Sequence, residues 1–419
     1  MADPGTLSAG TLFPGWMLLA WLLDAACLAL AVFWAVALFR LVRTALMVPT
    51  ARAGLRLPPP AGPAPPVCAV IPAHNEEATI GGLVASLRAQ DYPALRVVLC
   101  LDRCTDGTLA AVRRAIGGDG RFEVVEVAAC PEGWAGKVNA VAAGTATAAA
   151  RGADLLLFAD ADTQLDPACI RACVALLRER RLDLLSLLST LTCGRWFERL
   201  VQPAAGFELV REYPIVRANR RQSPRAFANG QFMLIRREAF EGAGGHEAVH
   251  DELLEDLALA RRLADAGRPI GVFLAAGLLR CRMYETWPAF RAGWKRIFVE
   301  ASHRKLGRLR RNGFYATFSG AVLPALTLLN VPWSLLLLGA GGEAASAGEM
   351  GLWLAGAGLV AWAAGNLAAY RMAGVPLWVL PGAPVGSWLL GRIMAEAATD
   401  LRDGVPIRWA AREYVRERR

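Results

Sequence analysis

Two carboxylates stand two positions apart in the stretch FADADTQLD. Asp160 and Asp162 directly follow the apolar run Leu155–Phe158. If that run is a β-strand whose geometry continues, residues i and i+2 face one side and both carboxylates point into one small volume. Two such charges at close range are unfavourable unless a cation or a proton offsets them. On spacing alone a turn that leads into a helix at Asp166 and Pro167 is equally open.

The sequence around this pair alternates strand and helix patterns. Apolar strands are predicted at 67–71, 97–101, 122–127 and 155–159, and helices at 79–89, 108–116, 138–149 and 168–178. Such alternation predicts an α/β fold with a mainly parallel, doubly wound sheet. Ligands of these sheets bind beyond the carboxyl ends of the strands.

Polar residues follow each of these predicted strands. The four loops read PAHNEE (72–77), DRCTDGT (102–108), PEGWAGKVNA (131–140) and DAD (160–162). Because the carboxyl ends of parallel strands meet at one edge of a sheet, we expect these loops to form one site. Ordinary polar loops carry mixtures of serine, glycine and lysine rather than a carboxylate at one strand exit after another.

The apolar content indicates membrane segments, since 55% of the residues are hydrophobic. The run 16–39 holds one charge, Asp24, and at 1.5 Å per residue it reaches roughly 36 Å, enough to cross a bilayer. It is too long for the core of a signal peptide, so we expect a retained anchor. Further spans are predicted at 316–338 and 351–370. The proline-broken stretch 375–391 is expected to re-enter the membrane or to lie at its surface.

The distribution of arginine predicts the orientation of these spans. Arginines follow the first span, precede the second and fill the tail 402–419, so the positive-inside rule places the intervening domain and the tail in the cytoplasm. Arginines that face anionic lipid explain much of the net charge of +9. No zinc finger, basic-aromatic repeat or helix-turn-helix pattern is present, and no nucleic-acid partner is expected. The nine cysteines are expected to be reduced.

These patterns divide the chain into five predicted parts. They are an N-terminal transmembrane anchor (1–45), a proline-rich linker (46–66), a cytoplasmic α/β domain with interfacial helices (67–312), a C-terminal membrane region (313–398) and a basic cytoplasmic tail (399–419). Amphipathic helices at 195–213 and 286–303 are expected to lie on the membrane surface.

Five motifs in order resemble the family 2 glycosyltransferases with the GT-A fold. They read VIPAHNEE, DRCTDGT, DAD, FANGQFMLIRREAF and HDELLEDLALARRL. GWAGKVNAV and RMYETWPAFRAGWKR, with membrane runs at both ends, are most similar to the hopene-associated glycosyltransferase group. The resemblance covers residues 65–310. It implies a GT-A, Rossmann-like, mainly parallel sheet with flanking helices, between N-terminal and C-terminal transmembrane helices.

The resemblance implies a donor site in the first two loops. Pro72, Asn75, Glu77 and Asp102 would contact the base and ribose of a nucleotide-sugar donor, and Asp106 would support the turn. Carboxylates suit a ligand whose base and sugar offer N–H and O–H donors.

The resemblance also implies a diphosphate and metal site. Lys137 would lie near the diphosphate, and a solvated lysine at a helix start is the alternative. Asp162 would bind Mg²⁺ or Mn²⁺ directly and Asp160 would act through the ribose or a water. The metal would neutralise the leaving nucleoside diphosphate.

Glu255 and Asp256 begin a predicted amphipathic helix. The resemblance implies that this acidic pair is catalytic, with Asp256 as the general base. Acidic residues in a first turn are favoured by the helix dipole alone, so a structural role stays open. Asn229 and Gly230 are where the family places its acceptor-side loop.

One family motif is absent. The Gln-x-x-Arg-Trp motif of processive polymer synthases has no counterpart, since residues 293–307 read GWKRIFVEASHRKLG. This speaks against chain extension. It leaves Trp294, Lys295 and Arg296 as candidates for holding the pyrophosphate on the acceptor side.

The resemblance thus predicts an inverting, metal-dependent glycosyltransferase in the inner cell membrane. It would move one sugar from a nucleotide-sugar donor to a lipid acceptor, a hopanoid or similar, at the cytoplasmic face. Inversion fits because a single displacement needs one base and no enzyme nucleophile. The alternatives are a polyprenyl-phosphate glycosyltransferase, whose acceptor is already ionised, and a non-catalytic membrane protein that binds a sugar nucleotide.

Overall fold

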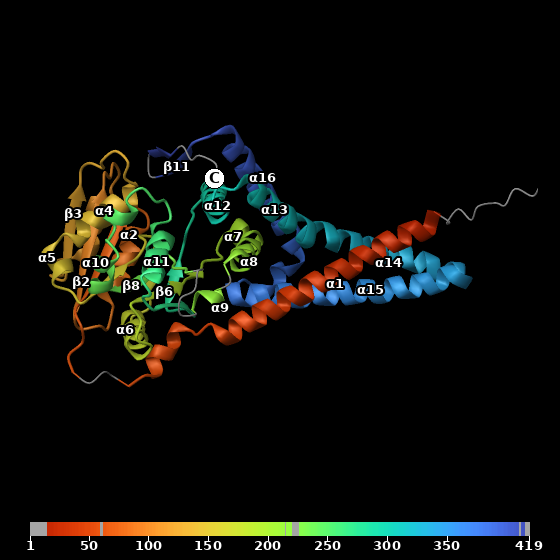
Figure 1. Cartoon of the computed structure of the whole chain (residues 1–419), viewed down its shortest axis with the longest axis horizontal. Coiled ribbons are helices and arrows are strands. Elements are labelled where there is room, and N and C mark those ends of the chain that lie inside the picture. Colours follow the sequence, from red (N-terminus) through yellow and green to blue (C-terminus); the bar gives the residue numbers. More distant parts are fainter. Residues whose placement is uncertain (1–14, 59–61, 214, 220–225, 410–411, 415–419) are drawn as a thin grey trace, which may run out of the picture. The chain divides into compact units, whose positions relative to one another are not determined.

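The computed structural model describes residues 15–58, 62–213, 215–219, 226–409 and 412–414. The chain divides into two compact units (Figure 1). The first comprises Met1–Val42, Leu200–Ala204 and Arg311–Arg392, and the second comprises Arg43–Arg199, Ala205–Arg310 and Ile393–Arg419.

The second unit is built on a seven-stranded sheet with the order β3-β2-β1-β4-β8-β6-β9. The strands are β1 (Val67–Ala73), β2 (Leu95–Asp102), β3 (Phe122–Val127), β4 (Leu155–Phe158), β6 (Leu184–Leu188), β8 (Met233–Arg236) and β9 (Ile270–Leu274). Strand β8 runs antiparallel to both of its neighbours, and the other neighbouring pairs are parallel. The predicted mainly parallel α/β fold is therefore confirmed.

Helices cover both faces of this sheet. Alternate residues of β1 divide between two cores: Val67, Ala69 and Ile71 join one, and Cys68 and Val70 join the other, as the two-residue period of a strand requires. The first core is closed by α2 (Ile80–Arg88), α3 (Thr108–Ile116) and α6 (Cys169–Glu179). The second is closed by α4 (Gly136–Thr145), α5 (Ala148–Arg151), α10 (Arg237–Gly242) and α11 (Glu255–Asp265).

The helix predicted at 138–149 is in fact two helices, α4 and α5. Thr147 has extended backbone angles, and its hydroxyl accepts a hydrogen bond from the N–H of Ala150 at 3.3 Å. A threonine in this position caps a new helix instead of continuing the old one. Apolar periodicity does not register such a cap, which explains the error.

A small second sheet begins directly after the DAD loop in the sequence. It has the order β5-β10-β7, with β5 at Thr163–Leu165, β10 at Leu279–Cys281 and β7 at Thr190–Leu191. Antiparallel pairing of β5 with β10 places Cys281 opposite Thr163. The sequence pattern did not predict these three strands. A separate pair, β11 (Ile407–Trp409) and β12 (Arg412–Tyr414), lies near the end of the chain.

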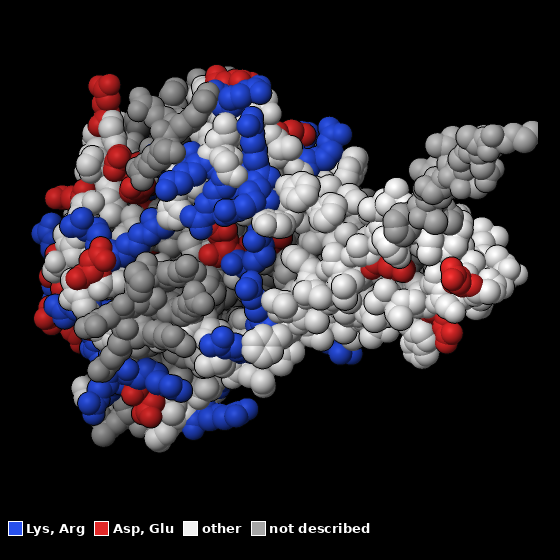
Figure 2. All heavy atoms as spheres, turned by 45° about the vertical axis from the view of Figure 1, so that its right-hand side comes forward, with Lys and Arg blue, Asp and Glu red and all other residues white. Residues whose placement is uncertain are grey.

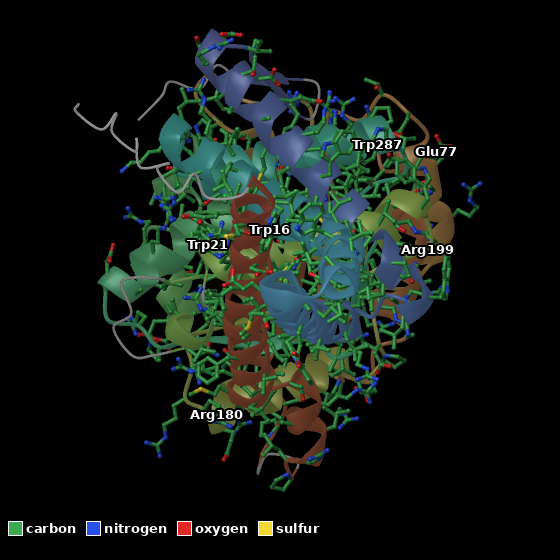
Figure 3. The ribbon with its side chains drawn as sticks, turned by 90° about the vertical axis from the view of Figure 1, so that its right-hand side faces the viewer. Trp16, Trp21, Glu77, Arg180, Arg199 and Trp287 are labelled. Carbon is green, nitrogen blue, oxygen red and sulfur yellow. The ribbon has the colours of Figure 1, made fainter. Side chains whose placement is uncertain are left out.

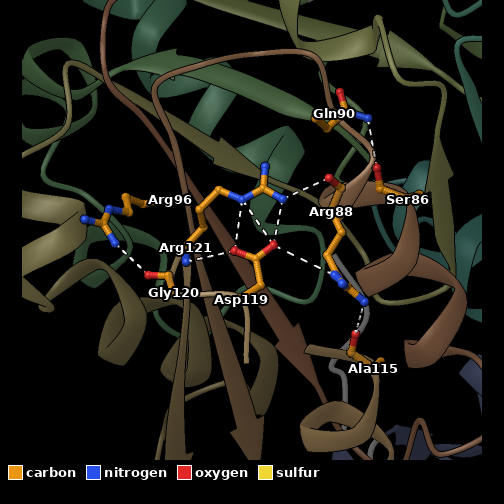
Figure 4. A network of polar contacts seen from close by, with 8 residues as sticks. All are labelled: Ser86, Arg88, Gln90, Arg96, Ala115, Asp119, Gly120 and Arg121. Atoms are coloured by element: carbon orange, nitrogen blue, oxygen red, sulfur yellow. Dashed lines mark hydrogen bonds and ion pairs between the residues drawn. The ribbon is translucent and has the colours of Figure 1, made fainter. Parts of the chain in front are cut away.

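An arginine network around Asp119 fastens the loop between α3 and β3 to the end of α2 (Figure 4). Arg121 donates to both carboxylate oxygens of Asp119, its Nη2 at 2.7 Å from Oδ2. The same guanidinium donates to the carbonyl of Arg88 at 2.9 Å. The hydrogen bonds from Arg121 lower the pKa of Asp119 to about 2. The network thus fixes the amino-terminal edge of the sheet, opposite to the edge at which the site is predicted.

The first unit contains long apolar helices. They are α1 (Gly15–Met47), α13 (Leu306–Thr317) continued through the π-helical turn η3 (Phe318–Val322) into α14 (Leu323–Ala340), and α15 (Gly342–Ala373). By length and composition, the described residues hold three helices that could cross a membrane: Gly15–Met47, Leu306–Ala340 and Gly342–Ala373. The predicted spans lie within these three helices. On the face shown in Figure 2 this unit is mostly white, with a few acidic and basic side chains, and Trp21 (Figure 3) is among its exposed apolar side chains.

Small and polar residues hold these helices together, as is usual between helices in lipid. A Cβ on Gly365 would lie 2.4 Å from the ring of Trp34, so the glycine allows α15 to approach α1 closely. The indole of Trp34 donates to the carbonyl of Ser319 at 3.1 Å. Asn330 donates to the carboxylate of Asp24 at 3.0 Å.

Both predicted amphipathic segments are helical. The first is divided into α7 (Trp196–Leu200) and α8 (Gln202–Glu212), which precede the short α9 (Ile215–Ala218), and the second is α12 (Trp287–Ala301). Trp196 packs against Trp287, with 5.0 Å between ring centroids. That these helices lie on a membrane stays a prediction.

Several short elements complete the chain. They are the 3₁₀ helices η1 (Ala51–Arg56), η2 (Glu247–Val249) and η4 (Leu377–Gly382), and the helix α16 (Ala383–Asp403). The stretch predicted as broken at 375–391 is thus a 3₁₀ turn followed by the start of a helix. Whether it re-enters a membrane stays a prediction, as do the five predicted parts of the chain.

Candidate functional site

The loop after β1 is tied to the loop after β2. Asn75 adopts a positive φ of 56°, and its side-chain carbonyl accepts a hydrogen bond from the N–H of Thr105 at 2.8 Å. The carboxylate of Glu77 accepts one from the N–H of Gly107 at 3.0 Å. The predicted donor-binding residues Asn75 and Glu77 therefore shape the loops at this edge. Pro72 lies on β1 itself, beside Cys100 of β2.

Asp102 and Asp106 have different surroundings. Asp102, at the end of β2, is 2% exposed, and Arg103 donates to both of its oxygens at 2.8 and 2.6 Å. Asp106 accepts from the N–H groups of Thr108 at 3.0 Å and of Glu77 at 3.2 Å. Burial raises the pKa of Asp106, but these hydrogen bonds outweigh it, so the pKa is lowered. Asp106 thus holds the turn that begins α3.

Asp160 and Asp162 lie in a turn, because β4 ends at Phe158. The prediction that both carboxylates face one side of a strand required the strand to continue through Asp162, and it does not. The turn nevertheless brings the two carboxylates close enough to interact: burial raises the pKa of Asp162 to about 8, and the charges of Asp160 and Glu76 add to the effect. Oδ1 of Asp162 is buried without a hydrogen-bond partner.

Lys137 connects this turn to α11. Its Nζ lies 2.6 Å from Oδ1 of Asp160 and 2.7 Å from Oε1 of Glu255. Burial would lower the pKa of Lys137, but these two carboxylates outweigh burial and raise it. The alternative of a solvated lysine at a helix start does not describe Lys137, which is bound between two acidic groups.

Asp256 is held by backbone groups at both oxygens. Gly230 N–H donates to Oδ2 at 2.6 Å and Leu257 N–H donates to Oδ1 at 2.7 Å. Burial, reinforced by the charge of Glu255, raises the pKa of Asp256 to about 6. The carboxylate is therefore ionised at neutral pH and can take up a proton. Asn229, beside Gly230, donates through its side chain to the carbonyl of Leu187 at 2.9 Å.

The three candidates on α12 have separate surroundings. Trp294 is 1% exposed and stacks on Phe298. Lys295 forms ion pairs with Glu396 and Asp400. Arg296 lies beside Tyr284. Burial raises the pKa of Tyr284, and the charge of Arg296 counteracts part of this rise. Tyr284 also lies near Asp162.

Two residues near the carboxylate pair were not singled out from the sequence. Burial raises the pKa of Glu76, and the charge of Asp160 adds to the rise. Cys281 is 1% exposed, and burial raises the pKa of its thiol, with the charge of Asp162 adding to the rise. Glu76 belongs to the HNEE stretch and could have been found from it. Cys281 reaches the site only through the pairing of β10 with β5, for which the sequence holds no local signal.

The carboxylates of this edge fit a hard divalent cation. Mg²⁺ and Mn²⁺ take carboxylate oxygens as ligands, and the buried Oδ1 of Asp162 has no protein donor. Among the described residues, no three histidine, cysteine, aspartate or glutamate side chains are grouped to hold a metal by themselves. Asp160 and Asp162 would therefore supply only part of a coordination shell, as is usual for cations bound together with a phosphate ligand.

Comparison with solved structures yields remote matches. A mannosyltransferase from Pyrobaculum calidifontis, in complex with GDP-Man and Mn²⁺, is 18% identical with a TM-score of 0.46, over 91% of this chain and 99% of that chain. S. aureus TarS 1-349 in complex with UDP-GlcNAc is 15% identical with a TM-score of 0.39, over 84% and 96% of the two chains.

Sequence comparison is more informative. The 4,4'-diaponeurosporenoate glycosyltransferase of Staphylococcus aureus (strain MRSA252) is 28% identical over 238 residues, which are 54% of this chain and 58% of that protein. The chain thus spans little more than half the length of this relative. A profile of the family described as "Glycosyltransferase like family 2" matches residues 64–298. The match covers more than half of the sequence and includes the site, and the chain therefore belongs to this glycosyltransferase family.

Proposed function

We propose that the chain transfers a single sugar from a nucleotide-sugar donor to a lipid acceptor, with inversion at the anomeric carbon. The acceptor would be a hopanoid or a similar lipid with a hydroxyl group. The observation that carries the proposal is the ion pairing of Lys137, which joins the DAD turn at Asp160 to Glu255 at the start of α11. The predicted donor side and the predicted base are thereby neighbours.

Asp256 would act as the general base. An alcohol must lose a proton as it attacks the sugar, and a positioned carboxylate with a raised pKa can accept it. Two backbone N–H groups fix the orientation of this carboxylate. Inversion follows from a single displacement in which the acceptor oxygen bonds to the anomeric carbon and the nucleoside diphosphate leaves.

Asp160 and Asp162 would hold a Mg²⁺ or Mn²⁺ ion. When bound, the ion would neutralise the charge that develops on the leaving diphosphate. Lys137 lies beside Asp160 and would bind diphosphate oxygens through its ammonium group. Pro72 and Asp102 would border the nucleotide, and the loops shaped by Asn75, Glu77 and Asp106 would enclose it.

A lipid acceptor is supported by the apolar helices of the chain. Three of them are long enough to cross a membrane, and a chain that carries them works next to lipid. One relative is named for a lipid-like acceptor, 4,4'-diaponeurosporenoate. Asn229, Gly230 and Arg296 would border the acceptor, because Gly230 contacts the base and Arg296 lies beside Tyr284, which lies near Asp162. The buried Trp294 and the ion-paired Lys295 would support α12.

The proposed topology places residues 67–310 and the tail after Arg402 in the cytoplasm of a cell with an inner membrane. Reporter fusions at Pro65 and Ala344 would test this topology. The two fusions should report opposite sides of the membrane. The same side for both would exclude the arrangement with three spans.

The proposed reaction is best tested by deleting the gene in its host and comparing lipid extracts by mass spectrometry. We expect one lipid to lose the mass of one sugar, which would identify the donor sugar and the acceptor together. If the lipid that loses the mass of a sugar is a polyprenyl phosphate, the acceptor is a polyprenyl phosphate instead. Unchanged lipids, together with nucleotide-sugar binding but no transfer by the purified chain, would favour a non-catalytic binding protein.

A further inference from the structure

Lys137 is bound between two carboxylates that come from different parts of the fold. Lys137 lies on α4, Asp160 lies in the turn after β4, and Glu255 begins α11. The side chains of Lys137, Asp160 and Glu255 are 25%, 29% and 6% exposed. Asp160 is thus the more accessible partner, and Glu255 is the buried one. A ligand that enters the site would reach Asp160 before it reaches Glu255.

The space around the ammonium group is small. A Cβ built on Gly230 would lie 3.1 Å from Nζ of Lys137 and 3.1 Å from Oδ2 of Asp256. An ammonium is a compact point charge, whereas a guanidinium is a broad planar fork. The chain has 46 lysines and arginines, of which only Lys137, Lys295 and Lys305 are lysine. The compact ammonium of Lys137 thus fits the small space between Gly230 and the two carboxylates.

We propose that Lys137 and the divalent cation compete for Asp160, and that the diphosphate of the donor receives Lys137 when the cation binds. This inference rests on the proposed function, and it takes Asp160 as a direct ligand of the cation rather than as a group that acts through the ribose or a water. It makes Lys137 a positioning residue that couples cation binding to diphosphate binding.

The competition follows from charge and distance. The ammonium lies 2.6 Å from Oδ1 of Asp160, and Mg²⁺ or Mn²⁺ binds carboxylate oxygens at about 2.1 Å. Two cations on one carboxylate would be near neighbours, and their repulsion in a partly buried site is strong. Glu255, at 2.7 Å, would keep hold of Lys137 as it leaves Asp160. Phosphate oxygens of the donor would then replace Asp160 as the second partner of the ammonium.

Binding of the two ligands should therefore be coupled. The cation alone would bind weakly because it must displace Lys137. A nucleoside diphosphate would tighten cation binding because it accepts the displaced ammonium, and by linkage the cation would tighten nucleotide binding by the same factor. Without the lysine, the cation would bind more tightly by itself and would gain little from the nucleotide.

The first test measures Mn²⁺ binding to the detergent-solubilised full chain by electron paramagnetic resonance. Wild type, Lys137→Met and, as a control, the exposed Lys305→Met are titrated with Mn²⁺ alone and with UDP or GDP present. We expect the K137M variant to bind Mn²⁺ alone at least fivefold more tightly than wild type. We expect the nucleotide to tighten Mn²⁺ binding at least fivefold in wild type and in K305M, and less than twofold in K137M.

The second test separates displacement from a general effect of a nearby positive charge. Lysines are acetylated briefly, and the rate at each of the three lysines is read by mass spectrometry. Lys295 is a matched internal reference, because it is also bound by two carboxylates and its side chain is 26% exposed against 25% for Lys137. We expect Mn²⁺ to speed acetylation of Lys137 severalfold, added UDP or GDP to slow it again, and Lys295 to stay constant.

The outcomes separate this inference from the proposed function. If wild type binds Mn²⁺ with the nucleotide but K137M binds Mn²⁺ alone no more tightly, the competition is excluded and the metal site stands. If saturating Mn²⁺ leaves acetylation of Lys137 unchanged, displacement is likewise excluded. If Mn²⁺ binds to no variant, with or without nucleotide, the metal site of the proposed function is wrong, and the inference falls with it.

Discussion

The backbone N–H of Gly230 donates a hydrogen bond to Oδ2 of Asp256 at 2.6 Å, across 26 positions of the sequence. It joins the loop before β8 to the first turn of α11. With Leu257 on the other oxygen, it leaves the Asp256 carboxylate little freedom to rotate. The absence of a side chain at Gly230 leaves room for this contact and for Lys137 at once. A carboxylate held in this way is oriented before any substrate arrives.

Gly230→Ala should therefore impair catalysis more than folding. The added Cβ would lie 3.1 Å from both Oδ2 of Asp256 and Nζ of Lys137, so both groups must move by a few tenths of an ångström. Small displacements of a catalytic group lower the rate steeply, and we expect kcat to fall by about tenfold. The melting temperature should change little, because the lysine end is flexible.

Gly81→Ala is the matched control for this variant. Gly81 lies in α2 and a Cβ there meets nothing within 4 Å, so the substitution should stabilise the helix slightly and leave kcat unchanged. If Gly230→Ala lowered the melting temperature but left the kcat of the folded protein unchanged, the contact would serve folding rather than orientation.

The rate should decline in acid because of Asp256. Burial and the charge of Glu255 raise its pKa to about 6, so the group is protonated, and lost as a base, as the pH falls through that value. A raised pKa also means that protonation of Asp256 favours the folded state between about pH 4 and 6. The decline should therefore occur without loss of secondary structure. A pH profile of kcat/KM, which reports the pKa values of the free enzyme, with circular dichroism at each pH, measures both, and a flat profile down to pH 5 would exclude this assignment.

The order of the main elements could be read from the sequence because it depends on local periodicity. The predicted strand at 122–127 agrees with β3 at Phe122–Val127, and the predicted helix at 108–116 agrees with α3 at Thr108–Ile116. The rule that parallel strands end at one edge then brought the DRCTDGT and DAD loops to the same region. Strand β8 runs antiparallel to both of its neighbours in the sheet, an orientation that the alternation of strands and helices does not predict.

The contacts that define the site could not be predicted in the same way, because they join distant segments. Nothing near Lys137 indicates that Glu255 will be its partner, 118 positions away by residue number. Cys281 reaches Asp162 through the register of β10 on β5. The proximity of Asp160 and Asp162 was expected for a reason that does not hold, since a turn and not a strand brings them together.

Asp162→Asn should abolish the metal dependence of nucleotide binding. The substitution keeps the shape of the side chain and removes the charge that a hard cation requires. We expect the affinity for UDP or GDP with Mn²⁺ to fall roughly tenfold or more, and the affinity in EDTA to stay the same. Isothermal titration calorimetry measures both.

The metal-free protein offers a control on the same variant. Burial raises the pKa of Asp162 to about 8, so without a cation the carboxyl is largely protonated at neutral pH, and an asparagine amide replaces it without loss of charge. The variant should therefore melt at the same temperature as wild type or higher in EDTA. If the variant binds UDP or GDP with Mn²⁺ as tightly as wild type does, the DAD motif is a turn and not a metal site.

The most direct test of the account is the transfer rate of Asp256→Asn. The purified chain in lipid nanodiscs is given a labelled nucleotide sugar, Mn²⁺ and host lipid extract, and label in the lipid phase is followed over time. A positioned base contributes 10²- to 10⁴-fold, or about 3 to 5 kcal/mol of barrier. We expect kcat to fall by about that factor, with UDP or GDP affinity unchanged. A folded variant that loses less than roughly tenfold would contradict Asp256 as the base for a hydroxyl acceptor, since a phosphate acceptor has no proton to lose.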